Sequence, residues 1–235
     1  MNDMNINASL PWTYDLDQAM RIQQNLSKRV SLTWDGRQVK TVAGIDTYDD
    51  GIVIHAAVSV YCFPELTHIM TVTGTATQGY PYISGMLAFR VGPAILEAWE
   101  KLKLSPELVI IHGQGVAHPR GFGLASHIGL WLNLPTIGIA KTRLYGTHAE
   151  VGPNLGDWSD IHDERNSKLI IGAALRTQPE VKPIYVSPGH LIDLSHSIEY
   201  VLACTRKYRI PEPLRHAQLV ASKAKRGSED LVSVA

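Results

Sequence analysis

The stretch from Glu107 to Lys141, "ELVIIHGQGVAHPRGFGLASHIGLWLNLPTIGIAK", decides the fold expected of this chain. Its apolar runs at 107–113 and 135–141 are typical of buried strands, and the segment 123–133 between them has the pattern of a helix. The first strand runs directly into glycines, which is typical of places where a ligand approaches the backbone. The order of elements therefore predicts an α/β fold with a ligand site at the ends of its strands.

Three strand-like runs precede this unit, at 39–48, 51–61 and 66–77. Only short connections separate them, so they are expected to form an antiparallel meander. The segment 92–104 then predicts a helix with Pro93 in its first turn. A meander followed by alternating helices and strands indicates a mixed central sheet, with parallel strands beside the antiparallel ones and helices on its faces.

Four further segments complete the organisation of what we expect to be a single domain over residues 1–235. An amphipathic helix is predicted over about 12–30, with Thr13 or Asp15 as its cap. The remaining expectations are a second hairpin (168–177 and 182–190) that delivers His190 to a loop, a closing helix (195–205) capped by Ser195, and a polar, partly flexible tail over about 218–235.

The composition is that of an ordinary soluble globular protein, with 45% hydrophobic and 19% charged residues. Lys plus Arg and Asp plus Glu both number 22, so no overall field attracts nucleic acid and binding would need a local patch. One candidate runs from Arg206 to Arg226, with seven basic residues and one acidic residue, Glu212. It is either a solvated tail or a contact with phosphates.

Cysteine usage and the pattern of apolar residues indicate a cytoplasmic protein. Cys62 and Cys204 are the only cysteines, which favours a reducing compartment. The first 20 residues lack a basic segment followed by an apolar one, and no run is long enough to span a bilayer, so no membrane association is expected. The sequence also lacks G-x-S-x-G and H-E-x-x-H, and His118 breaks the G-x-G-x-x-G candidate that begins at Gly113.

Polar side chains follow three of the predicted strands. Asp46 ends one of them, where a carboxylate is costly unless it binds a metal, pairs with a cation or caps a turn. Lys141 lies near Arg143, and the two cations can dock a phosphate, although a lysine at a strand end also commonly extends to solvent. His112 ends the strand before the glycines, and His118 alone would more often be a packed loop histidine.

Four blocks of the sequence, taken in order, resemble one family. They are "AGIDTYDD", "GYPYISGMLAFRVGPAILEAWEKL", "IIHGQGVAHPRGFGLASHIGLWLNLPTIGIAKTRLYG" and "VSPGHLIDLSHSIEYVLACTRKYRIPEPLRHA". The family is endonuclease V, metal-dependent nucleases that recognise inosine in DNA or RNA. The resemblance implies an RNase H-like fold, a Mg²⁺ or Mn²⁺ cofactor, and DNA or RNA with deaminated bases as the partner. We also expect the protein to be a monomer.

The resemblance also implies roles for individual residues. Tyr82 matches an aromatic wedge that fills the gap left by a base turned out of the duplex, although a surface turn would also suit it. The other implied roles are metal binding (Asp46), lining of the base pocket (Gly85, Gly113 and Gln114), contact with the scissile phosphodiester (His118 and Lys141) and a place beside the metal (His190).

Two positions depart from the family pattern at the metal site. Where the family carries a glutamate and an aspartate, this chain has Val91 and His112. Mg²⁺ prefers oxygen ligands, so we expect impaired or lost Mg²⁺-dependent cleavage and a protein that still binds nucleic acid. The alternative is an active nuclease with a remodelled site, in which Asp46, His112 and His190 hold Mn²⁺, Fe²⁺ or Zn²⁺.

Overall fold

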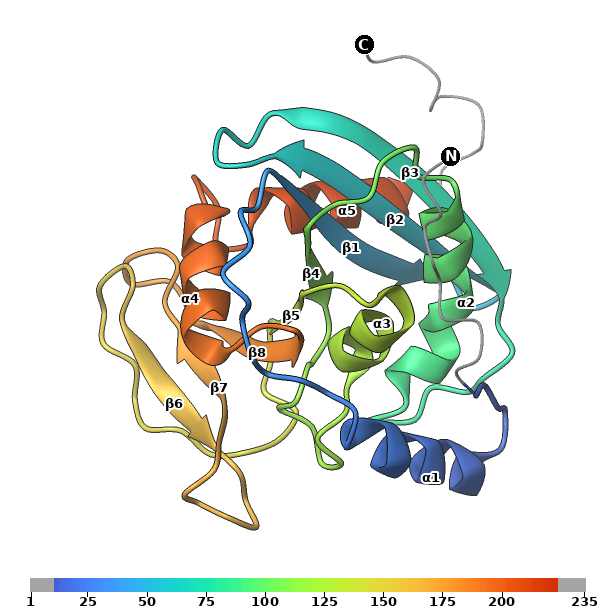
Figure 1. Cartoon of the computed structure of the whole chain (residues 1–235), viewed down its shortest axis with the longest axis horizontal. Coiled ribbons are helices and arrows are strands. Elements are labelled where there is room, and N and C mark those ends of the chain that lie inside the picture. The colour runs from blue at the N-terminus through green and yellow to red at the C-terminus, as the bar shows by residue number, and fades with distance from the viewer. Residues whose placement is uncertain (1–10, 224–235) are drawn as a thin grey trace.

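A computed structural model describes residues 11–223 of the protein, which form one eight-stranded sheet in the order β3-β2-β1-β4-β5-β8-β7-β6 (Figure 1). The strands are β1 (Thr41–Asp49), β2 (Val53–Cys62), β3 (His68–Thr77), β4 (Leu108–His112), β5 (Thr136–Ala140), β6 (Trp158–His162), β7 (Ile170–Leu175) and β8 (Ile184–His190). The first three form the predicted antiparallel meander. β1, β4 and β5 are parallel neighbours, and β8 then runs antiparallel to β5.

Helices cover both faces of the sheet, as predicted. They are α1 (Leu16–Ser27), α2 (Leu87–Glu100), α3 (Leu124–Leu132), α4 (Leu194–Ala203) and α5 (Glu212–Lys223). The first three pack together with β1, β2 and β4 in one buried cluster, whereas α4 and α5 contribute to a cluster on the other face. Figure 1 shows the two groups on either side of the strands. The mixed sheet flanked by helices is therefore confirmed.

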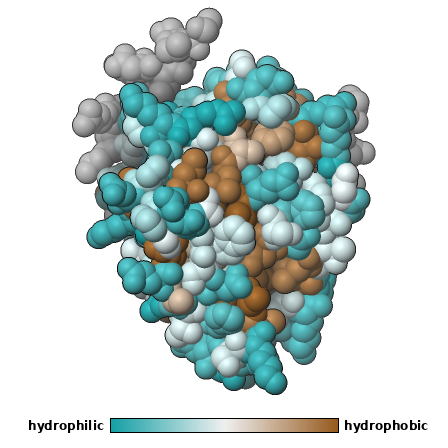
Figure 2. Space-filling model, turned by 90° about the vertical axis from the view of Figure 1, so that its left-hand side faces the viewer, coloured by the Kyte–Doolittle hydropathy of each residue, from teal (hydrophilic) through white to brown (hydrophobic). Residues whose placement is uncertain are grey.

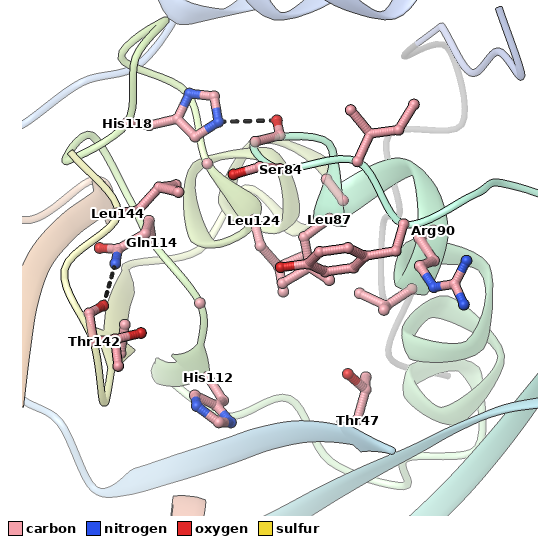
Figure 3. Close-up of a pocket in the computed structure, with 18 of the residues that line it drawn as sticks. Thr47, Ser84, Leu87, Arg90, His112, Gln114, His118, Leu124, Thr142 and Leu144 are labelled. Atoms are coloured by element: carbon pink, nitrogen blue, oxygen red, sulfur yellow. Dashed lines mark hydrogen bonds between the residues drawn. The ribbon is translucent and has the colours of Figure 1, made fainter. Parts of the chain in front are cut away.

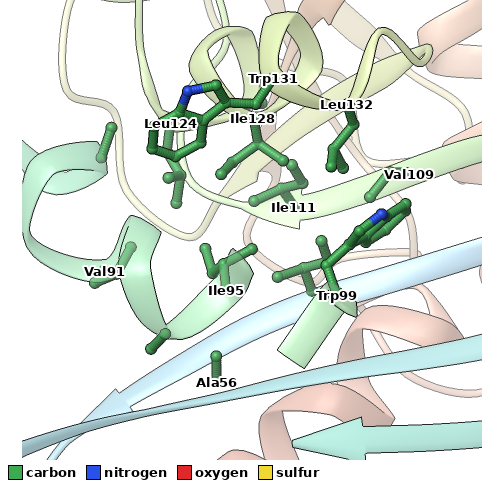
Figure 4. Close-up of a cluster of buried hydrophobic side chains, with 14 of the residues drawn as sticks. Ala56, Val91, Ile95, Trp99, Val109, Ile111, Leu124, Ile128, Trp131 and Leu132 are labelled. Carbon is green, nitrogen blue, oxygen red and sulfur yellow. The ribbon is translucent and has the colours of Figure 1, made fainter. Parts of the chain in front are cut away.

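The larger buried cluster fixes α2 over the sheet. Ile95 and Trp99 of α2 and Ile128 of α3 point toward Ile111 of β4 (Figure 4), and all four side chains are at most 2% exposed. Burial of side chains of this size contributes roughly 1.5–3 kcal/mol each. The ends of the strands beside α2 are consequently held by a well-packed core.

The expected start of α2 was wrong. The helix begins at Leu87 rather than residue 92, so Pro93 lies inside it and Val91 is one of its buried residues, 3% exposed. An interior proline removes one helical hydrogen bond, but the burial of Ala88 and Phe89 in the preceding turn offsets that cost. Val91 therefore belongs to the core, which matters for any substitution at this position.

The expected tail was also wrong over the part that the structure describes. Residues up to Lys223 continue α5, because Leu214, Ala217 and Ala221 recur at helical spacing and are buried against β1 and β2. The helix lies so close to the sheet that a Cβ atom on Gly44 would be 2.1 Å from the carbonyl carbon of Pro213. The rest of the predicted tail, 224–235, lies outside the described residues.

Smaller differences concern the second half of the chain. α4 is capped by Asp193, whose carboxylate accepts the backbone N–H of His196, rather than by Ser195. The edge strand β6 falls in a segment for which no strand was expected. Figure 2 shows apolar side chains among polar ones on the side of the molecule where α4, β6 and β7 lie. The exposed apolar residues of β6, β7 and their loops, Leu155, Trp158, Leu169 and Ile170, do not line the pocket described next.

Candidate functional site

A pocket of about 430 Å³ lies where β1, β4 and β5 end beside α2 (Figure 3). Parallel strands bring their carboxyl ends to one edge of a sheet, and the register places Ile45 beside Ile111 and His112 beside Ile139. Nine of the ten predicted site residues line this pocket: Asp46, Tyr82, Gly85, His112, Gly113, Gln114, His118, Lys141 and Arg143. The structure thus brings together groups that are up to 97 positions apart in the sequence, from residue 46 to residue 143.

Asp46 and His112 form the centre of the pocket's polar wall. The Nδ1 atom of His112 lies 2.9 Å and 3.0 Å from the two carboxylate oxygens of Asp46. The same carboxylate accepts the backbone N–H of Thr47 at 2.7 Å. Because Asp46 is only 5% exposed, these contacts supply the partners that a buried carboxylate requires.

The tenth predicted residue, His190, does not join the site, and its expected place beside the metal was wrong. β8 runs antiparallel to β5, so His190 pairs with Thr136 at the opposite end of that strand, roughly 10 Å from Ile139. It ends β8 rather than lying in a loop, and its Nδ1 atom accepts the backbone N–H of Ser31 at 3.2 Å. Burial lowers the pKa of His190 to about 4.

The residues at the pocket do not fit a magnesium site. Across residues 11–223, no three histidine, cysteine, aspartate or glutamate side chains come together in an arrangement able to hold a metal ion. Val91 offers no ligand atom, and the carboxylate of Asp46 faces an imidazole. Mg²⁺ requires several oxygen ligands in near-octahedral geometry, and the pocket's two carboxylates, Asp46 beside His112 and Asp49 paired with Arg90, fall short of that requirement.

An ion pair between Arg90 and Asp49 lies at the pocket and was missed by sequence reasoning. Arg90 donates to the carboxylate of Asp49 through Nε at 2.9 Å and through a second, terminal nitrogen. The same guanidinium donates to the backbone carbonyl of Tyr80. It therefore ties the end of β1 to the loop that carries Tyr82, whose side chain is 76% exposed. The sequence signal that could have pointed to Arg90 is its position directly before Val91.

His118 has no free ring nitrogen. Its Nε2 atom donates to the carbonyl of Gly85 at 2.9 Å, and its Nδ1 atom accepts the backbone N–H of Arg120 at 3.1 Å. These partners assign a neutral ring with the proton on Nε2. Burial lowers the pKa of His118 to about 4, so the ring stays neutral at physiological pH.

The loop beside His118 requires glycine at position 85. Gly85 has a φ of +80°, and a Cβ atom there would lie 2.8 Å from a terminal nitrogen of Arg120. Both the left-handed backbone and the close contact exclude a larger residue without a shift. On the other side of the pocket, the buried amide of Gln114 donates to the carbonyl of Thr142 at 3.4 Å (Figure 3). Lys141 and Arg143 lie exposed at the rim.

Comparisons with known proteins agree with this geometry. A sequence model of the family described as Endonuclease V matches residues 24–219. The chain belongs to the endonuclease V family. A protein named Endonuclease V from Rippkaea orientalis is 44% identical over 221 residues, which cover 93% of this chain and 95% of that protein.

Solved endonuclease V structures have the same fold. The structure from Streptomyces avermitilis superposes with a TM-score of 0.84 at 38% identity, covering 93% of this chain and 96% of the other. Endonuclease V from Ciona intestinalis, in complex with a 24mer DNA containing an inosine followed by a ribo-adenosine, gives 0.77 at 28% identity, covering 90% and 97%. The RNase H-like fold expected from the resemblance is thus confirmed.

Membership in the endonuclease V family supports a nucleic-acid-binding protein of the nuclease type. Family membership also fits a divalent metal cofactor. The paired carboxylate of Asp46 and the apolar side chain of Val91, in contrast, do not fit a metal site. None of the helices in the described part of the chain combines the length and the apolar character needed to cross a bilayer.

Proposed function

We propose that this endonuclease V homologue binds nucleic acid containing inosine or another deaminated base and that its Mg²⁺-dependent cleavage is impaired or lost. The observation that carries the proposal is the contact of Asp46 with His112 in a pocket that retains its other predicted residues. The residues for taking up a base and a phosphate are in place. The carboxylates for holding Mg²⁺ are not.

The base-binding part of the proposal rests on Tyr82 and the pocket beside it. Tyr82 is exposed on a loop that Arg90 holds through the Tyr80 carbonyl, so its ring is free to enter a nucleic acid. A ring inserted where a base has left the stack replaces stacking worth roughly 1–3 kcal/mol per base. The cavity of about 430 Å³ beside it then receives the base.

The strand-binding part rests on the rim. Lys141 and Arg143 are both exposed just after β5 ends, and each can meet a phosphate. The chain has no net charge, so its attraction to nucleic acid must come from such local clusters. The complex of Ciona intestinalis endonuclease V with inosine-containing DNA supports the same partner class here.

Loss of cleavage follows from the chemistry of the wall opposite the rim. Hydrolysis of a phosphodiester by such enzymes uses a metal ion to activate water and to stabilise the developing charge. His112 stands where an aspartate is expected, and it also contacts the carboxylate of Asp46. The buried Val91 stands where a glutamate is expected. His118 does not compensate, because both of its ring nitrogens are occupied.

The remodelled site of Asp46, His112 and His190 is not retained as a second candidate, because His190 lies at the other end of β5. Side chains at opposite ends of one strand cannot meet at one ion. A monomeric protein in the cytoplasm remains our prediction for the cellular form.

The test compares binding with cutting in one set of samples. Purified protein is mixed with single- and double-stranded DNA and RNA oligonucleotides that carry inosine or adenosine at one position, in EDTA, Mg²⁺ or Mn²⁺. We expect a preference for inosine in the gel shift and intact strands in Mg²⁺. Equal binding of inosine and adenosine strands would refute the binding role, and the DNA and RNA arms identify the preferred polymer.

A further inference from the structure

Three side chains from separate segments donate to one backbone carbonyl at the edge of the pocket. The oxygen of Gly85 accepts Nε2 of Gln23 at 2.9 Å, Nε2 of His118 at 2.9 Å and a terminal nitrogen of Arg120 at 3.0 Å. A carbonyl oxygen has two lone pairs, so this acceptor is saturated. It has no capacity left for a hydrogen bond from a base in the pocket.

Gln23 is the member of this group that connects the others. It comes from α1, 62 positions before Gly85, and it is only 1% exposed. Its Nε2 atom also donates to the carbonyl of Phe122 at 3.1 Å, and its Oε1 atom accepts Nε of Arg120. Because arginine is only a donor, this contact fixes which end of the amide faces which partner.

The arrangement joins two loops that border the pocket. Gly85 belongs to the loop that carries Tyr82, and Phe122 precedes Gly123, which also lines the pocket. A single buried amide thus sets the spacing between these loops. A buried donor without a hydrogen-bond partner is energetically costly, so the amide of Gln23 keeps the carbonyls of Gly85 and Phe122 in place.

We infer that Gln23 is a positioning residue for base selection: it holds the Gly85 carbonyl away from the base and thereby keeps the pocket selective for inosine. This inference rests on the proposed function. It assigns a part in base recognition to α1, a helix that is not among the strand ends that form the site. Gln23 lines the pocket, but its amide is engaged by Gly85, Phe122 and Arg120, so it acts through the backbone of Gly85.

The experiment uses two variants of Gln23 and a matched control. Gln23→Met keeps the size of the side chain and removes all three polar contacts. Gln23→Glu removes the donors to Gly85 and Phe122 but keeps an acceptor for Arg120, so it serves if the methionine variant does not fold. Gln24→Met makes the same change at the next residue of α1, which is exposed.

The first readout is the ratio of the dissociation constants for adenosine and inosine strands, with its dependence on salt. We expect both Gln23 variants to lower this ratio by about tenfold, or about 1.4 kcal/mol, through weaker binding of inosine. The salt slope should stay unchanged because the substitutions remove no cation from the phosphates. The control should match the wild type. An unchanged ratio in folded Gln23 variants would mean that the amide is a structural filler only.

The second readout needs no nucleic acid. Amide hydrogen exchange of residues 83–87 and 121–123 should accelerate in the Gln23 variants and not in Gln24→Met. Unchanged exchange overturns the inference even where the wild type prefers inosine. Accelerated exchange together with a wild type that shows no preference would instead leave the positioning role intact and refute the proposed function.

Discussion

The imidazole of His112 and the carboxylate of Asp46 contact each other where the parallel pairing of β1 and β4 ends, with Nδ1 2.9 Å and 3.0 Å from the two oxygens. The resemblance to the endonuclease V family implies that both positions supply carboxylates to a metal in its other members. A pair of adjacent carboxylates repels itself unless a cation lies between them. In the function that we propose, the histidine therefore replaces a site that needs a metal by a contact that is stable without one.

Restoring the carboxylates should restore metal binding and cleavage. We expect Val91→Glu with His112→Asp to bind Mg²⁺ and nick an inosine strand, and each single substitution to do little, because a metal site acts as a unit. Val91 is buried in α2, so the glutamate will lower the free energy of unfolding by roughly 1–3 kcal/mol without metal. Calorimetry checks binding, and a nicking assay checks activity. A double variant that binds Mg²⁺ but does not cut would show that other positions have also diverged.

Removal of the exposed tyrosine should weaken binding of inosine specifically. Tyr82→Ala loses a stacking surface worth roughly 1–3 kcal/mol, so the dissociation constant for an inosine duplex should rise about fivefold or more. Trp158→Ala is the matched control, because Trp158 is also an exposed aromatic residue, 56% exposed, and does not line the pocket. Equal effects of the two substitutions in a fluorescence titration would contradict the wedge role.

Charge at the rim should govern the dependence of binding on salt. Replacing Lys141 or Arg143 by glutamine should reduce the log–log salt slope by roughly 0.7–0.9 for each phosphate that is no longer neutralised. Lys207→Gln provides the comparison, because the predicted basic segment from Arg206 contributes no residue to the pocket over its described part, up to Lys223. There, Arg206 and Arg209 donate to the backbone carbonyls of Pro64 and Lys182. If only Lys207→Gln changed the salt slope, the nucleic acid would contact the segment beginning at Arg206 rather than the rim of the pocket.

Stability should fall in acid because of buried histidines. Burial lowers the pKa of His127 to about 3 and that of His118 to about 4. Below about pH 6.5 these histidines bind protons in the unfolded chain but stay neutral in the folded chain. The free energy of unfolding therefore decreases as the pH falls from 6.5 toward these pKa values.

The near-isosteric variant His127→Phe isolates one of these groups. His127 is fully buried, and neither ring nitrogen has a partner among the described residues. Each pKa unit corresponds to about 1.4 kcal/mol, so urea titrations at pH 7 and pH 5 should show a smaller acid loss in His127→Phe than in the wild type. His148→Phe, at a partly exposed histidine, should keep the full loss. Identical pH profiles for all three proteins would contradict this explanation.

The sequence was sufficient for the meander, the parallel strands and the convergence of Asp46, His112 and Lys141, because apolar runs and short connections determine these features locally. It misplaced His190, because the direction of β8 depends on the partner that it finds in the sheet and not on its own residues. The start of α2 was missed because Pro93 is a typical first-turn residue, and tertiary burial overrode that preference.

Two other features depend on contacts between distant segments. α5 has weak intrinsic signals and is stabilised by packing on β1 and β2. Gln23 shares the buried face of α1 with Ala19 and Leu26, at i−4 and i+3, so a polar residue on that face was the available signal. Its three partners, however, become visible only when the loops are folded around it.

The most direct test of the account is a single incubation of the unmodified protein with an inosine-containing duplex in Mg²⁺, scored for both complex formation and nicking. We predict a complex that forms in preference to an adenosine control, with the strand left intact at a protein concentration that saturates binding. Efficient nicking of the inosine strand in Mg²⁺ would contradict the claim that the contact between His112 and Asp46 has replaced the metal site.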